Sequence, residues 1–187
     1  MYEKLKLMFV GASPLIMHSS QTVDPLNKYT RALKEISGKR KKVDADYLEM
    51  ARIEFLAALY SDEDGDVVLP SENIEACLVG GAKKSKSGIQ AKSGLFVEQP
   101  TKLIYDGPKT PKELFEDSRF RHTCPAKIGA SRVMRTRPIF KKWSAEVEIT
   151  YLTEVLTERD IRDFAYQAGM LVGIGDWRPK HGRFNVV

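Results

Sequence analysis

The sequence predicts an α+β domain whose elements follow the βαββαβ order of ferredoxin-like (RRM-like) folds. Three observations predict this fold class. An alternating apolar pattern indicates a strand at residues 4–10, and helical patterns with an apolar stripe occupy residues 71–84 and 158–172. Strand-like runs fill residues 95–152, and a last strand is expected at 183–187. A chain of 187 residues is long enough to form one domain with its own hydrophobic core.

The first strand places Leu5, Leu7 and Phe9 on one face, and the loop that starts at Gly11 ends it. A helical segment is expected at residues 27–60, between this strand and the later elements. Gly38 ends its first helix, and Asp44 is a plausible N-cap of its second. The apolar stripe of that second helix comprises Leu48, Ala51, Phe55 and Leu59.

Local signals also mark the later elements. Ser71 is a plausible N-cap for the helix at 71–84, and Thr157 followed by Asp160 predicts the start of the last helix. Gly173 is expected to end that helix. Residues 83–94 are small, polar and basic, which predicts a mobile loop. Two strand-like runs around Gly129 predict a basic β-hairpin at about 119–142.

The positive charge is segregated along the chain, although the net charge is only +5. Residues 118–145 contain no Asp or Glu and eight Lys or Arg side chains, including Arg132, Arg135 and Arg137. A second acid-free cluster comprises Lys83, Lys84, Lys86 and Lys92, and a third lies at 39–42. Such segregation favours a polyanionic partner, because a solubilising surface interleaves its signs. The alternative is a basic face that is simply solvated.

The segment from Gly173 to Phe184 combines three glycines with cationic and aromatic side chains. This composition suits a phosphate chain with stacked bases, although it also fits a Gly-rich helix end followed by a turn. The segment follows a helix C-terminus, so a helix dipole cannot attract the anion there. Phe184 is expected in the core, and the candidate ligand contacts are Trp177 as a stacking platform and Arg178, Lys180, His181 and Arg183.

Several classes of protein are excluded by composition. No run approaches the 18 or so apolar residues that a membrane span requires, and the N-terminus leads directly into a strand, so neither a membrane segment nor a signal peptide is expected. Cys77 and Cys124 lie in no metal-binding or redox spacing, which predicts reduced thiols in a cytoplasmic protein. Three scattered histidines make no zinc site, so we expect no metal site and no cofactor.

Three stretches, in this order, resemble the repeat-associated mysterious protein (RAMP) superfamily, and specifically the backbone subunits that coat guide RNA in CRISPR effector complexes. They are the opening strand with residues 11–18, the strand, Pro-Ser turn and helix at 68–76, and the glycine-rich tail. The resemblance implies a modified ferredoxin-like palm (1–19 and 67–187) that includes the basic hairpin as a thumb, a helical insertion (20–66), and side-by-side self-association along a single strand. The chain is shorter than most members, which suggests a minimal or phage-encoded relative.

These observations lead to three hypotheses. The first is a sequence-independent protein that binds single-stranded RNA, or less favourably single-stranded DNA, and multimerises along it. The second is a mimic of a RAMP subunit that caps or inhibits CRISPR-type effector subunits. The third is a metal-dependent ribonuclease, because some relatives cleave RNA with an Asp in the loop after the first strand, where this chain has Asp24. A single carboxylate without a partner is thin support for a nuclease, and Asp-Pro is also ordinary turn chemistry.

Overall fold

The computed structural model describes the backbone of residues 1–187 and every side chain except those of Ile128 and Ser131. It is a mixed α/β structure with antiparallel sheets, as the α+β prediction requires. Its contacts divide the chain into two compact units. Unit 1 comprises residues 1–15, 66–106 and 140–187, and unit 2 comprises residues 16–65 and 107–139. No helix among the described residues is long and apolar enough to cross a membrane.

This division differs from the predicted domain plan at one point. The helical insertion expected at 20–66 corresponds closely to the first segment of unit 2. The basic hairpin, which the resemblance assigns to the palm, clusters with that helical segment instead. The basic hairpin and the helical segment therefore belong to one compact unit.

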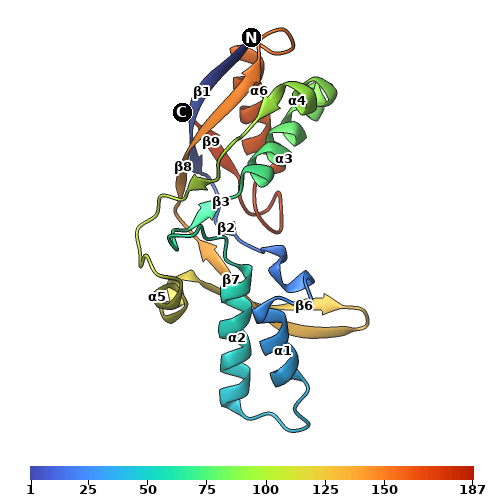
Figure 1. Ribbon diagram of the computed structural model, residues 1–187, viewed down its shortest axis with the longest axis vertical. Coiled ribbons are helices and arrows are strands. Elements are labelled where there is room, and N and C mark those ends of the chain that lie inside the picture. Colours follow the sequence, from blue (N-terminus) through green and yellow to red (C-terminus); the bar gives the residue numbers. More distant parts are fainter. The chain divides into compact units, whose positions relative to one another are not determined.

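Unit 1 is built on a four-stranded antiparallel sheet (Figure 1). Its strand order is β4 (Leu95–Phe96), β8 (Ser144–Leu152), β1 (Tyr2–Gly11) and β9 (Phe184–Val186). The alternation seen in the sequence decides which face is covered. Leu7, Phe9, Val147 and Ile149 are buried on one face, while Lys4, Lys6, Glu146 and Glu148 lie on the other.

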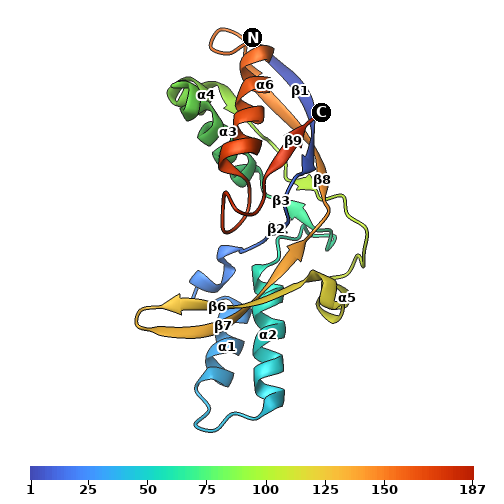
Figure 2. The same ribbon diagram turned by 180° about the vertical axis from the view of Figure 1, so that it is seen from behind.

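Helices α3 (Ser71–Ala82) and α6 (Glu158–Gln167) lie together on the covered face (Figure 2). Their approach depends on Gly81, because a Cβ there would lie 2.2 Å from the carbonyl oxygen of Phe164. The predicted start of α6 is confirmed, since Thr157 and Asp160 form a reciprocal capping box. Gly173, with a φ of 74°, ends the π-helical turn that follows α6 at Ala168–Val172. The short strands β3 (Val68–Leu69) and β5 (Thr101–Lys102) complete this unit's sheets.

The prediction of a mobile loop at residues 83–94 is wrong. The chain forms a 3-10 turn at Lys83–Ser85 and then helix α4 at Gly88–Gly94. Ala91 and Leu95 are buried and hold α4 against the body of unit 1. Two apolar anchors therefore order a segment that its polar composition alone would leave disordered.

Unit 2 contains a helical hairpin of α1 (Lys28–Ser37) and α2 (Asp44–Ala58), with α5 (Pro111–Glu116) and the turns at Ser20–Val23 and Ser118–Phe120 beside it. Gly38 caps α1 as expected. Val43, and not Asp44, is the N-cap of α2, and Leu48 is 65% exposed although it was predicted to be in the core. The buried residues of α2 lie in its second half, from Ile53 to Ala58, and α1 packs against this helix.

The predicted basic hairpin is confirmed in unit 2. Strands β6 (Arg121–Ile128) and β7 (Ser131–Phe140) pair antiparallel around a two-residue turn that includes Gly129, whose φ is 57°. With β2 (Leu15–Ile16) they form a sheet in the order β2-β7-β6. Pro125 is tolerated because β6 is the edge strand. The turn end of the hairpin projects away from α1 and α2 (Figures 1 and 2).

Candidate nucleic-acid interface

The glycines of the tail serve its own folding. The amide of Ile174 donates to the carbonyl of Gly182 at 2.9 Å, and a Cβ on Gly182 would lie 1.7 Å from the carbonyl oxygen of Ile174. Gly182 has a φ of 72°, a conformation that strongly favours glycine. The tail is therefore an ordered loop whose two ends touch, which accounts for its glycines without a ligand.

This loop is anchored to the segment after β1. The amide of Arg183 donates to Ser13 Oγ at 2.9 Å, and its carbonyl accepts from the amides of Ala12 and Ser13. Trp143 Nε1 donates to the Ser13 carbonyl at 2.9 Å, and its ring leaves no room for a Cβ on Gly11. Residues 11–13 and the tail, two of the three stretches that carry the family resemblance, thus have a shared structural role.

Four of the predicted contact residues line one groove of unit 1. This tail groove, of about 720 Å³, lies between the end of α3 and the tail, and among its lining residues are Lys83, Lys84, Leu171, Trp177, Arg178 and Pro179. Trp177 is 40% exposed, and its φ of 54° is unusual for a residue with a side chain. The amide of His181 donates to the Trp177 carbonyl at 3.1 Å and closes the turn that presents the indole.

Any attraction of the tail groove for an anion comes from its side chains and not from helix termini. Both α3 and the π turn after α6 end at this groove, and helix C-termini carry partial negative charge. Lys83, Lys84 and Arg178 oppose that charge, and Asp176 is the one carboxylate in the lining. The groove can therefore hold a polyanion through its cations, and the exposed indole offers a face for a base.

The other two predicted lysines lie at a neighbouring groove. Lys86 and Lys92 line a hollow of about 930 Å³ between α3 and α4, together with Lys83 and the apolar side chain of Ile89. Ile89 is 85% exposed. Lys83 lines both hollows, and Glu72 and Glu75 of α3 also line the hollow between α3 and α4, so its lining carries both signs of charge.

The remaining tail residues belong to the same loop without lining the tail groove. Lys180 and Arg183 are exposed, and His181 is half-buried with its ring centroid 6.1 Å from that of Trp177. Phe184 is in the core, as expected, and stacks on Phe9 at 4.2 Å. Of the two aromatic residues of the tail, Phe184 is therefore buried and Trp177 is exposed.

The three hairpin arginines lie in unit 2 and differ in environment. Arg132 is exposed on β7 and stands opposite Lys127 of β6. Arg135 and Arg137, predicted to share a face, both line a cavity of about 440 Å³. Arg135 forms an ion pair with Glu54 of α2. A role for Arg135 in phosphate binding stays a prediction, and the structure gives this side chain a carboxylate partner.

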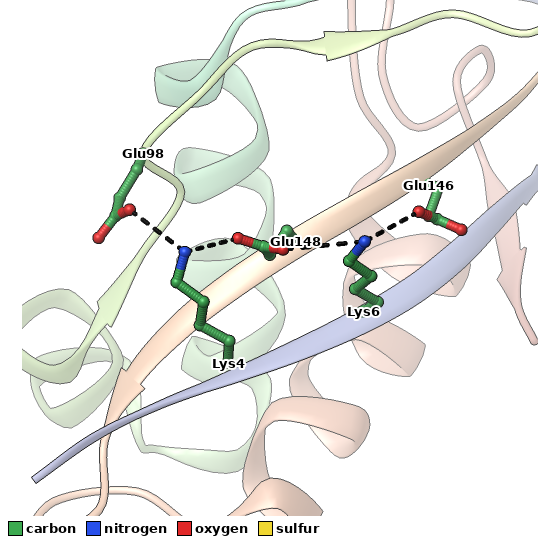
Figure 3. A network of polar contacts seen from close by, with 5 residues as sticks. All are labelled: Lys4, Lys6, Glu98, Glu146 and Glu148. Carbon is green, nitrogen blue, oxygen red and sulfur yellow. Dashed lines mark hydrogen bonds and ion pairs between the residues drawn. The ribbon is translucent and has the colours of Figure 1, made fainter.

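The open face of the unit 1 sheet carries an ion-pair network (Figure 3). Lys4 contacts Glu148 at 2.7 Å and Glu98 at 3.7 Å, and Lys6 contacts Glu146 at 3.5 Å. The hydrogen bond between Lys4 and Glu148 raises the pKa of the lysine and lowers the pKa of the glutamate. Three carboxylates against two ammonium groups repel a polyanion, so this face is a poor platform for a nucleic acid.

Asp24 is part of a turn. Its carboxylate accepts from the amide of Leu26 at 2.8 Å, which is the hydrogen bond of an Asx turn, and it lies just before α1. The described residues contain no group of three or more His, Cys, Asp or Glu side chains that could hold a metal ion. The ribonuclease hypothesis therefore gains no support from the surroundings of Asp24.

Sequence reasoning missed two kinds of site residue. Leu171 falls in the helix predicted at 158–172 and was not selected as a site residue, but it is 50% exposed and lines the tail groove, because the π turn shifts the helical phase after Gln167. Glu54 and Lys127, which line the cavity in unit 2, were not selected at all. The position of Lys127 within the acid-free run was the available signal, whereas nothing in the sequence joins Glu54 to the hairpin.

Comparison with known proteins gives no family assignment. No protein-family model matches this chain, and no curated protein sequence matches it either.

Proposed function

We propose that this protein binds single-stranded nucleic acid independently of sequence, RNA in preference to DNA, and multimerises along the strand. The observation that carries the proposal is the tail groove, where Lys83, Lys84 and Arg178 surround the exposed ring of Trp177. These residues were selected from two separate parts of the sequence, and they line one hollow. Cations beside an exposed aromatic face are the elements that single-strand binding proteins use.

A single strand fits this groove better than a duplex does. Stacking on Trp177 needs a base that is free of pairing, and bases in a duplex are stacked on one another. A groove of about 720 Å³ is within the range of small-ligand sites and can hold a nucleotide, but it is far too small for a double helix. The ion-paired sheet face offers no alternative platform in unit 1.

The arrangement of unit 1 supports a ferredoxin-like palm within this proposal. The strand order β4-β8-β1-β9, with α3 and α6 on one face, is the order expected when two βαβ halves interleave. The preference for RNA and the assembly along the strand come from the resemblance to RAMP backbone subunits. Fold alone does not give function, so the binding residues have to be tested directly.

The test compares labelled single-stranded RNA, single-stranded DNA and duplex of about 30 nucleotides in fluorescence anisotropy, at several salt concentrations. We expect single strands to bind more tightly than duplex and Trp177→Ala to weaken binding by about 5- to 150-fold, the equivalent of about 1–3 kcal/mol of stacking. Tyr166→Ala is the matched control, because Tyr166 is an exposed aromatic residue of α6 at 58% exposure. Equal, weak binding of all three ligands would refute the proposal.

A second candidate function is a RAMP-subunit mimic that binds a protein complex. Exposed apolar side chains gather at the start of α2, where Val43, Tyr47 and Leu48 are 59–65% exposed, and such patches are typical of protein interfaces. This function predicts a monomer with negligible affinity for nucleic acid that co-purifies with effector subunits. Its binding should be lost in Tyr47→Ser/Leu48→Ser and retained in Trp177→Ala.

A further inference from the structure

A carboxylate of α2 holds the hairpin of unit 2 through two contacts. Glu54 is 11% exposed at its side chain, and it pairs with the guanidinium of Arg135 through Oε1. Its Oε2 accepts from the backbone amide of Thr136 at 3.0 Å. A guanidinium and a backbone amide that converge on one anion are also the donors that bind a phosphate group in proteins. Glu54 thus occupies a position in which a phosphate would find the same partners.

The surroundings hold more positive charge than this ion pair needs. The cavity of about 440 Å³ at this point is lined by the cationic side chains of Lys127, Arg135 and Arg137, and Glu54 is the one carboxylate in its lining. The Arg135 side chain keeps 34% of its surface exposed despite its contact with Glu54. Three cationic side chains, Lys127, Arg135 and Arg137, therefore stand against one carboxylate in this lining, an arrangement that favours an anion.

We propose that this cavity is a phosphate-binding site and that Glu54 is an internal competitor for Arg135. The proposal rests on the proposed function, since the phosphate belongs to the backbone of the bound single strand. Without a ligand, Glu54 holds Arg135 and the backbone of β7. When a strand binds, its phosphate meets Lys127 and Arg137 and competes with Glu54 for the guanidinium of Arg135. Glu54 therefore lowers the affinity for nucleic acid while it fixes the hairpin.

The decisive variant is Glu54→Gln, which removes the charge and keeps an acceptor for the amide of Thr136. The matched control is Glu49→Gln on the same helix, because Glu49 is also paired with an arginine, Arg52, at 2.6 Å. Both variants raise the net charge by one, so a difference between their affinities for RNA reports on the cavity. Binding to single-stranded RNA is measured against salt, with thermal unfolding of each variant as a check of folding.

We expect Glu54→Gln to bind about fivefold more tightly than Glu49→Gln at about 0.1 M salt, with a salt slope steeper by about 0.7, as one additional phosphate contact gives. The gain should disappear when Arg135 is changed to Ala in both backgrounds. Equal affinities of the two variants, or a gain that persists without Arg135, would overturn the inference. If Glu54→Gln does not fold, Glu54→Asp can replace it. This change moves the carboxylate away from Arg135 by one methylene and should also raise the affinity for single-stranded RNA.

The two proposals can fail separately. If the wild-type protein binds RNA and Glu54→Gln matches its control, the inference fails and the proposed function stands. If the wild-type protein binds no strand, the proposed function fails, and inorganic pyrophosphate then tests the cavity by thermal shift. Stabilisation of Glu54→Gln beyond that of Glu49→Gln supports a phosphate site, and equal shifts overturn it.

Discussion

Replacing the two lysines of the tail groove tests whether this groove binds phosphates. Lys83 and Lys84 line it together with Arg178, so up to three phosphates can be neutralised there. For a single strand, each neutralised phosphate contributes about 0.7 to the slope of log affinity against log salt. The groove as a whole then contributes about 2.1, and Lys83→Gln/Lys84→Gln should lower the slope by about 1.4.

The measurement is a salt titration of binding to single-stranded RNA between about 0.05 and about 0.2 M salt. Over this fourfold range, the wild-type affinity should fall about sevenfold further than that of the variant. The matched control is Lys4→Gln/Lys6→Gln, which removes the same charge from the sheet face of unit 1, where both lysines are paired with glutamates. A slope that is unchanged in the groove variant, or lowered equally in the control, would refute the assignment of the tail groove.

Three further predictions concern the fold of unit 1. Gly81→Ala should lower the free energy of unfolding by about 3 kcal/mol in urea denaturation, because its Cβ would lie 2.2 Å from the carbonyl oxygen of Phe164. Thr157→Ala should lower the free energy of unfolding by about 1 kcal/mol at neutral pH, because it removes the N-cap of α6. The hydrogen bonds from Thr157 hold the pKa of Asp160 below its usual 3.8. The stabilisation is therefore present above the unfolded-state pKa and is lost as the pH falls through the lower folded-state pKa. The unfolding free energies of the wild type and Thr157→Ala should thus become more alike in acid. Burial raises the pKa of Cys77 to about 12, so iodoacetamide at about pH 8 should label this thiol only after unfolding, as mass spectrometry can show.

Local signals in the sequence predicted elements whose ends are fixed by their own residues. Thr157 and Asp160 cap α6, and Gly38 and Gly129 stand at the helix end and the turn that they were expected to form. These signals act within a few residues, and so they can be read from the sequence alone. The helix α4 was missed because what orders it is the burial of Ala91 and Leu95 against the rest of unit 1.

The candidate sites depend on contacts across long separations in sequence. Lys83 and Trp177 were each selected for their own chemistry, but the groove that both of them line exists only in the folded chain. The pairing of Glu54 with Arg135 joins residues 81 positions apart, and no local pattern announces it. Residue type therefore supplied the candidate residues, while the fold was needed to distinguish lining residues from structural ones.

The pairing of β1 has a consequence for how the chain matures during synthesis. Phe9 pairs with Ala145 on one side and with Val186 on the other, so both neighbours of this strand are synthesised long after it. Until then, Leu7 and Phe9 lack the β-sheet partners of the finished fold. Such a delay favours misassociation of nascent chains and slows folding, because contacts between distant residues carry a high entropic cost. The sheet of unit 1 is therefore expected to form in one late, cooperative step after β8 and β9 have been synthesised.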